Sequence, residues 1–104
     1  MKTTFKKGGY SALTASEYVN SNRPIYLLSN ELEPQVKFED RKPTDEIVAY
    51  KAWFSQEGLP PFSVKFDSKI TLPDYMSIIT FENLLACEVN YNVYFKADNL
   101  KEVN

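Results

Sequence analysis

Short runs in which apolar and polar residues alternate, separated by turn-forming residues, are the feature that most constrains how this chain folds. In residues 62–66 every other residue is apolar, with Ser63 and Lys65 between them. A period of two places successive side chains on opposite faces of a β-strand, so this run predicts a half-buried strand. Comparable runs recur at intervals of roughly 8–15 residues, which is typical of a small barrel or sandwich.

The longest such run covers residues 47–54 and contains neither glycine nor proline. Its alternation places Lys51 and Trp53 on one face and Tyr50 and Phe54 on the other. We expect the face that carries Phe54 to point into the core.

Further strands are predicted over residues 77–81, 84–89 and 92–97. Asparagine tolerates positive φ, so Asn90 and Asn92 favour a hairpin between the last two strands, with Tyr91 at its tip.

The first 40 residues are less regular. Strand pieces are predicted at 26–28 and 36–38, whereas residues 11–19 fit either a strand or one short amphipathic helix. The acidic stretch 31–46 is interpreted as a solvated loop. Five phenylalanines and the single cysteine are assigned to the core: Phe38, Phe62, Phe66, Phe81, Phe95 and Cys87.

Catalysis is not expected. The 104 residues include no histidine, the commonest general base and a usual zinc ligand. Three glycines, at 8, 9 and 58, form no phosphate-binding loop. We therefore expect a protein that binds a partner, without enzymatic activity, metal or cofactor.

The cellular location is predicted from the apolar runs, the N-terminal residues and the cysteine content of the chain. No apolar run is long enough to span a bilayer, and the N-terminal residues do not resemble a signal peptide. One cysteine cannot form an internal disulfide. We expect a cytoplasmic protein that does not bind a membrane.

Basic and aromatic residues are predicted on the outer face of the sheet. This combination suits single-stranded nucleic acid, because cations bind phosphates and flat rings stack on bases. The alternative is that the tyrosines fill the core and that Trp53 caps a barrel end. The predicted contacts are Lys51, Trp53, Lys65, Tyr91, Tyr94 and Lys96.

The net charge of −2 does not favour a nucleic-acid partner, but the charge is uneven. Lys6, Lys7 and Arg23 lie in a basic N-terminal third, where we expect them to make peripheral phosphate contacts. Residues 1–9 are interpreted either as a flexible basic arm or as a frayed terminus.

The segments 45–48, 61–66, 70–73 and 94–100, the last of which ends in Ala97-Asp98-Asn99-Leu100, resemble the YdcP-like helicase processivity proteins of Gram-positive conjugative elements. This resemblance implies an OB-fold-like protein that binds single-stranded DNA and assists strand separation in rolling-circle replication. More distantly, residues 24–27 and 61–65 are similar to filamentous-phage gene V type single-stranded DNA-binding proteins. That similarity implies a stacking role for Tyr26 and favours a homodimer.

The resulting hypothesis is one OB-fold-like domain over residues 1–104, all-β with at most one short helix, forming a five-stranded, partly open Greek-key barrel. It would bind single-stranded DNA without strong sequence preference in a phage, plasmid or conjugative element, with a helicase or replication protein as a further partner. One alternative is an acidic protein-interaction module that inhibits a host nucleic-acid enzyme. Another is a small virion assembly protein.

Overall fold

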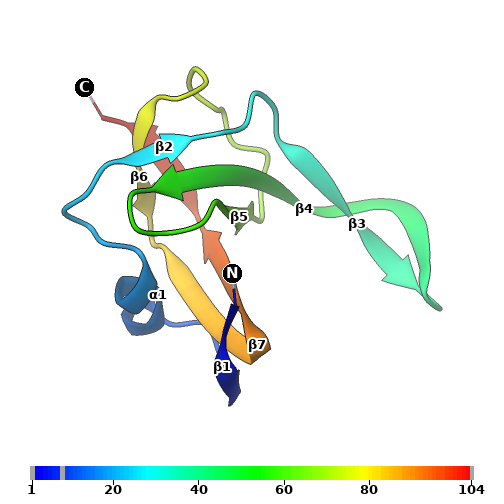
Figure 1. Ribbon diagram of the computed structural model, residues 1–104. Helices are drawn as coiled ribbons and strands as arrows, with labels where there is room; N and C mark the ends of the chain where they lie inside the picture. The colour runs from blue at the N-terminus through cyan, green and yellow to red at the C-terminus, as the bar shows by residue number, and fades with distance from the viewer. Residues whose placement is uncertain (1, 8, 104) are drawn as a thin grey trace.

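The computed structural model describes the backbone of residues 2–7 and 9–103 and the side chains of residues 9–103. It is mostly β-sheet with one short helix, as predicted (Figure 1). In chain order the elements are β1 (Lys2–Lys7), α1 (Ala12–Tyr18), β2 (Ile25–Leu27), β3 (Glu33–Glu39), β4 (Lys42–Gln56), β5 (Phe62–Phe66), β6 (Ile78–Glu82), β7 (Leu85–Ala97) and β8 (Asn99–Glu102).

The strands form one open sheet of eight strands, where five strands were expected. Their order is β1-β7-β5-β4-β2-β6-β8, and β3 pairs with β4 outside this path. Neighbouring strands are antiparallel except β5 and β7, which are parallel. The outer parts of β3 and β4 project from the rest of the sheet (Figure 1). We call this projection, residues 36–47, the hairpin extension.

The core lies against the inner face of β4 and confirms the predicted alternation over residues 52–54, whereas Val48, predicted on the core face, is 48% exposed and Ala49, predicted on the outer face, is buried. Phe54 is fully buried, and its ring lies 4.8 Å from that of Phe81 and 6.1 Å from that of Phe62. Phe66 and Phe95 are also buried, and Phe81 packs partly buried against the same cluster. Lys51 and Trp53 therefore point away from the core.

Residues 11–19 form the helix rather than the strand. The Ser11 side chain caps α1 by accepting a hydrogen bond from the Thr14 backbone N–H at 3.0 Å. Ala15 and Val19 are buried in the core cluster. The buried Gln56 side chain donates hydrogen bonds to the carbonyls of Asn20 and Arg23, which holds the chain between α1 and β2.

The predicted reversal of the chain near Tyr91 is confirmed. Residues 85–97 belong to one strand element, β7, which bends back on itself (Figure 1). Tyr18 accordingly contacts both limbs of β7, because its hydroxyl donates a hydrogen bond to the Glu88 carboxylate and its ring lies 6.4 Å from that of Phe95. Asn90 adopts positive φ, at 57°, at this bend, where the β1 pairing also shifts in register.

The acidic stretch 31–46 is also not a loop, because most of it belongs to β3 and β4. Asp40 and Arg41 join these strands with φ values of 50° and 65°, as a two-residue type I′ turn requires. The assignment of Phe38 to the core is wrong, because this residue lies on the hairpin extension and is 64% exposed. Cys87 is buried, as predicted.

The N-terminal segment interpreted as a flexible arm or a frayed terminus contains strand β1, which pairs antiparallel with β7. The side chains of Lys6 and Lys7 lie outside the described residues. Within residues 2–7 and 9–103, no helix has the length and apolar character needed to cross a membrane.

Candidate nucleic-acid interface

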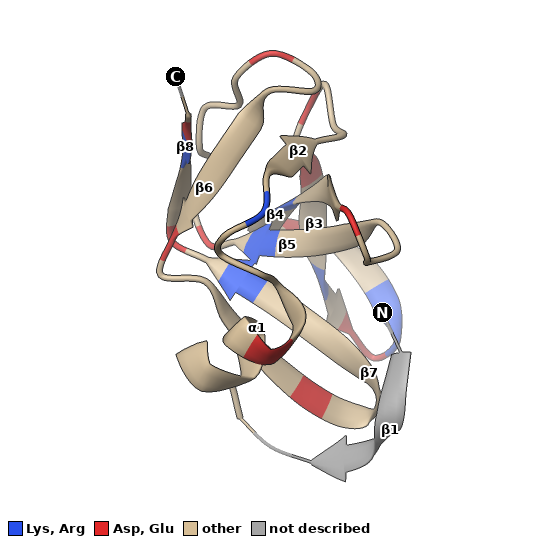
Figure 2. Ribbon diagram, turned by 60° about the vertical axis from the view of Figure 1, so that its left-hand side comes forward, with Lys and Arg blue, Asp and Glu red and all other residues tan. Residues whose placement is uncertain are grey.

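Three lysines form a row across the outer face of the sheet. In the strand register Lys51 on β4 pairs with Lys65 on β5, and Lys65 pairs with Lys96 on β7. Figure 2 shows the basic segments of β5 and β7 side by side. Within residues 9–103 no carboxylate lies within ion-pair distance of these lysines. Their charges are therefore available to an anionic ligand.

A second row lies two residues from the lysine on each strand and carries two aromatic rings. Trp53 on β4 pairs with Ser63 on β5, and Tyr94 precedes Lys96 by two residues on β7. Side chains two apart on a strand share a face. Trp53 and Tyr94 accordingly lie beside the lysine row, and they are 38% and 50% exposed.

Two contacts to the indole ring and one to the backbone hold Trp53 in place. Its indole N–H donates a 2.9 Å hydrogen bond to Glu33 Oε2, and the Lys51 Nζ lies 5.3 Å from the ring centroid. Its backbone N–H donates to the hydroxyl of the buried Ser29 at 2.8 Å. This last bond lies where the partner of β4 changes from β3 to β2. The ring is thus preorganised on the surface.

Tyr10 adds a third ring that the sequence analysis did not assign to the site. Two backbone hydrogen bonds between Ser11 and Ala86 hold this part of the chain against β7. The Tyr10 ring centroid lies 4.6 Å from Lys96 Nζ and 5.9 Å from Lys65 Nζ. Tyr10 therefore joins the aromatic and lysine rows.

Burial raises the pKa of the Tyr10 hydroxyl from 10.0 to about 12, with further contributions from a hydrogen bond to the Cys87 thiol and from the charge of Asp67. Removing the Tyr10 proton would place a negative charge in a partly buried, hydrogen-bonded position. The hydroxyl therefore stays neutral well above physiological pH.

The two rows enclose a surface cavity of about 240 Å³, which we call the aromatic hollow. Lysine, amide and hydroxyl groups line it together with core residues. No acidic residue lines it. Its lining comprises Tyr10, Gln35, Lys51, Trp53, Phe62, Ser63, Lys65, Val93, Tyr94 and Phe95.

Four of the predicted contacts, Lys51, Trp53, Lys65 and Tyr94, line the aromatic hollow, and Lys96 reaches it through Tyr10.

Tyr26 lies on the same outer face, because it pairs with Ser55, but it does not line the hollow. Tyr91 is 56% exposed on β7 and also lies outside the lining.

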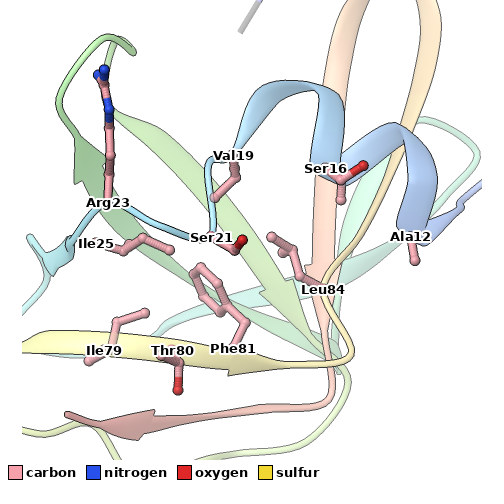
Figure 3. A pocket seen from close by; sticks show the side chains of 11 residues that line it. Ala12, Ser16, Val19, Ser21, Arg23, Ile25, Ile79, Thr80, Phe81 and Leu84 are labelled. Atoms are coloured by element: carbon pink, nitrogen blue, oxygen red, sulfur yellow. The ribbon is translucent and has the colours of Figure 1, made fainter.

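Arg23 lines a different cavity, of about 250 Å³, between α1 and β6 (Figure 3). Its side chain extends away from Ile79 and Phe81, and its guanidinium donates to the carbonyl of Glu57 at 3.3 Å. This cavity is lined mainly by small and apolar residues, so its lining carries no group suited to acid–base catalysis. We find no role in the aromatic hollow for Arg23.

The acidic residues expected as a separate charged surface are interspersed with basic ones. Lys37 on the hairpin extension forms ion pairs with Glu39 at 3.5 Å and Glu46 at 3.9 Å. In the part of the chain that the structure describes, no three histidine, cysteine or acidic residues lie close enough together to hold a metal ion.

Residues missed by the sequence analysis reach the hollow through long-range pairing. Gln35 lies there because β3 pairs with β4, and Tyr10 lies there because residue 11 bridges to β7. The local sequence Gly8-Gly9-Tyr10 gives no sign that Tyr10 reaches the hollow.

No family model matches this chain, and neither a curated protein nor a solved structure matches it.

Proposed function

We propose that the aromatic hollow binds single-stranded nucleic acid, namely single-stranded DNA without strong sequence preference, and that the protein acts by binding rather than by catalysis. The observation that carries this proposal is the pair of adjacent rows on one face. Lys51, Lys65 and Lys96 form one row, and Trp53 and Tyr94 flank it. Phosphates and bases need these two kinds of contact side by side.

The cation–π contacts suggest how binding proceeds, because contacts with the nucleic-acid strand can replace contacts within the protein. In the free protein the ammonium of Lys51 lies near the Trp53 ring, and that of Lys96 lies near the Tyr10 ring. An incoming strand offers a phosphate to each ammonium and a base to each ring. Each stacked base contributes about 1–3 kcal/mol, so two or three rings with phosphate contacts are sufficient for micromolar binding.

We also propose that the sheet is a variant of the partly open Greek-key barrel of the OB type. Two features support this. The parallel pairing of β5 with β7 requires a crossover, and β8 begins two residues after β7 ends, so one segment pairs with β5 first and β6 afterwards. In OB folds the second and third barrel strands form the ligand face. Under this correspondence they are β4 and β5, which carry Trp53 and Lys65.

A role in replication or transfer of a phage, plasmid or conjugative element, with a helicase or replication protein as partner, rests on the resemblance described above. The acidic-inhibitor alternative has less support. The acidic residues of the hairpin extension alternate with Lys37, Arg41 and Lys42, so they do not form a uniformly negative surface.

The test is a fluorescence titration with an oligo-dT of about 20 nucleotides, long enough to cover the roughly 4–16 nucleotides that one OB domain contacts. The chain has one tryptophan, so any quenching reports on Trp53 directly. We expect quenching at low salt and an affinity that falls as salt increases. Absence of binding at low salt would refute the proposal.

A matched pair of variants tests the location. Lys65→Gln removes a charge from the hollow, whereas Lys69→Gln removes an exposed charge four residues away that lines a different cavity. We expect weaker binding for the first variant and unchanged binding for the second. Equal losses would show that the protein binds through its general charge.

A further inference from the structure

The hairpin extension is amphipathic, and its apolar face is uncovered. Phe38 pairs with Pro43 and Val36 pairs with Ile47, so these four side chains lie on the same face. Phe38 is 64% exposed and Ile47 is 49% exposed. A solvated position is unusual for large apolar side chains grouped in this way.

The opposite face of the hairpin extension is charged and internally paired. Lys37 contacts both Glu39 and Glu46, and the Thr44 hydroxyl donates a hydrogen bond to the Lys37 carbonyl at 2.7 Å. The charged face is therefore suited to water, whereas the apolar face is not.

The hairpin extension also has a free strand edge. Within the described residues β3 pairs with β4 alone. A two-stranded hairpin is marginally stable in water, and an unpaired edge presents backbone N–H and C=O groups to any strand that approaches. Both features indicate a third strand on the outer side of β3.

The charge pattern of β3 identifies this strand as a second copy of the same chain. Antiparallel pairing of two β3 strands about Phe38 places Lys37 of each copy opposite Glu39 of the other, and the two Phe38 rings side by side. Pairing centred on Lys37 would instead oppose two lysines. Opposite charges across strands are stabilising and like charges are destabilising.

We propose that the protein forms a two-fold symmetric dimer in which β3 strands of two copies pair antiparallel about Phe38, with the apolar faces of both hairpin extensions forming one surface. Such an interface is isologous, because both copies use the same surface, with Lys37 of each meeting Glu39 of the other. A nucleic-acid strand is a poorer occupant, since the extension carries basic and acidic residues in nearly equal number.

Sedimentation velocity over a range of protein concentrations tests the proposal. We expect a species of twice the 12.0 kDa chain mass that dissociates on dilution. Phe38→Glu should raise the dissociation constant at least about 30-fold, as for an interface hot spot. Leu13→Glu is the matched control, because Leu13 is 73% exposed on α1, and it should leave dissociation unchanged.

The register has its own test. Lys37→Glu should weaken the dimer roughly tenfold by opposing like charges across the axis, and the double variant Lys37→Glu/Glu39→Lys should recover most of the loss. Far-UV circular dichroism of each variant checks that the fold is retained. A wild-type monomer at all concentrations, a dimer insensitive to Phe38→Glu, or no recovery in the double variant would overturn the proposal. A monomer that captures a different protein would overturn it as well.

Discussion

The two halves of β4 lie in very different surroundings, and the first half belongs mostly to the hairpin extension. In the second half Phe54 is fully buried, and Trp53, on the other face, borders the aromatic hollow. In the first half Ile47 and Val48, on successive positions, are both about half exposed, at 49% and 48%. Alternation defines which side chains share a face. Whether that face is buried depends on which other elements pack against it.

The largest difference between the second half of β4 and the hairpin extension should appear in stability. Phe54→Ala removes a ring that contacts Phe62, Phe66 and Phe81, and we expect it to lower the free energy of unfolding by about 3–5 kcal/mol. Phe38→Ala should cost less than about 1 kcal/mol, because a solvated ring buries little surface. Urea unfolding of dilute protein, below the concentration at which copies associate, measures both. Equal losses would show that the hairpin extension packs on the body of the protein.

This contrast explains how much of the fold was predictable. Period-two alternation correctly placed Phe54 inside and Trp53 outside, because the pleat of a strand enforces it. The same local pattern assigned Phe38 to the core, which was wrong because its ring is 64% exposed on the hairpin extension. Asn90 was assigned to a turn because of its tolerance for positive φ, and the chain does reverse there, between the two limbs of β7.

The residues of the candidate site were likewise predictable only as far as alternation determines which side chains point outward. The strand register unites Lys51, Lys65 and Lys96, and their outward positions followed from alternation alone. Tyr10 could not be placed, because it reaches the hollow only through the bridge between residues 11 and 86. Local sequence carries no information about a pairing that distant.

The next largest difference between the second half of β4 and the hairpin extension should appear in ligand affinity. Trp53→Ala removes one stacking surface, and we expect it to weaken oligo-dT binding by about 1–3 kcal/mol, or roughly 5- to 150-fold. Phe38→Ala serves as the control and should bind normally. Fluorescence anisotropy of a labelled oligonucleotide measures both variants without relying on tryptophan. Equal effects would extend the ligand site to the hairpin extension.

The salt dependence of binding should show which single lysines contact a phosphate. Each lysine that contacts a phosphate contributes about 0.7 to the slope of log affinity against log salt for single strands. Lys65→Gln and Lys96→Gln should each reduce the slope by about this amount, and Lys42→Gln, on the hairpin extension, should not change it. A reduced slope for Lys42→Gln would extend the interface beyond the hollow.

The smallest expected effect is the response of Tyr10 to alkaline pH. Its folded-state pKa of about 12 lies above the ordinary 10.0, so the folded state holds the proton more tightly than the unfolded state does. The associated stability is complete below pH 10 and is lost as pH rises from about 10 towards 12. Wild type should therefore lose more stability over this range than Tyr10→Phe. Identical losses would mean that Tyr10 ionises as freely as in the unfolded chain.

The most direct test of the central claim is a ¹H–¹⁵N correlation spectrum recorded during titration with oligo-dT. The protein has one indole N–H, that of Trp53, whose hydrogen bond to Glu33 makes its signal sensitive to changes at the ring. We predict shifts of this signal and of the Lys65 and Tyr94 amides, while the Phe38 and Arg41 amides stay unchanged. Shifts confined to the hairpin extension, with the indole signal unmoved, would contradict binding in the aromatic hollow.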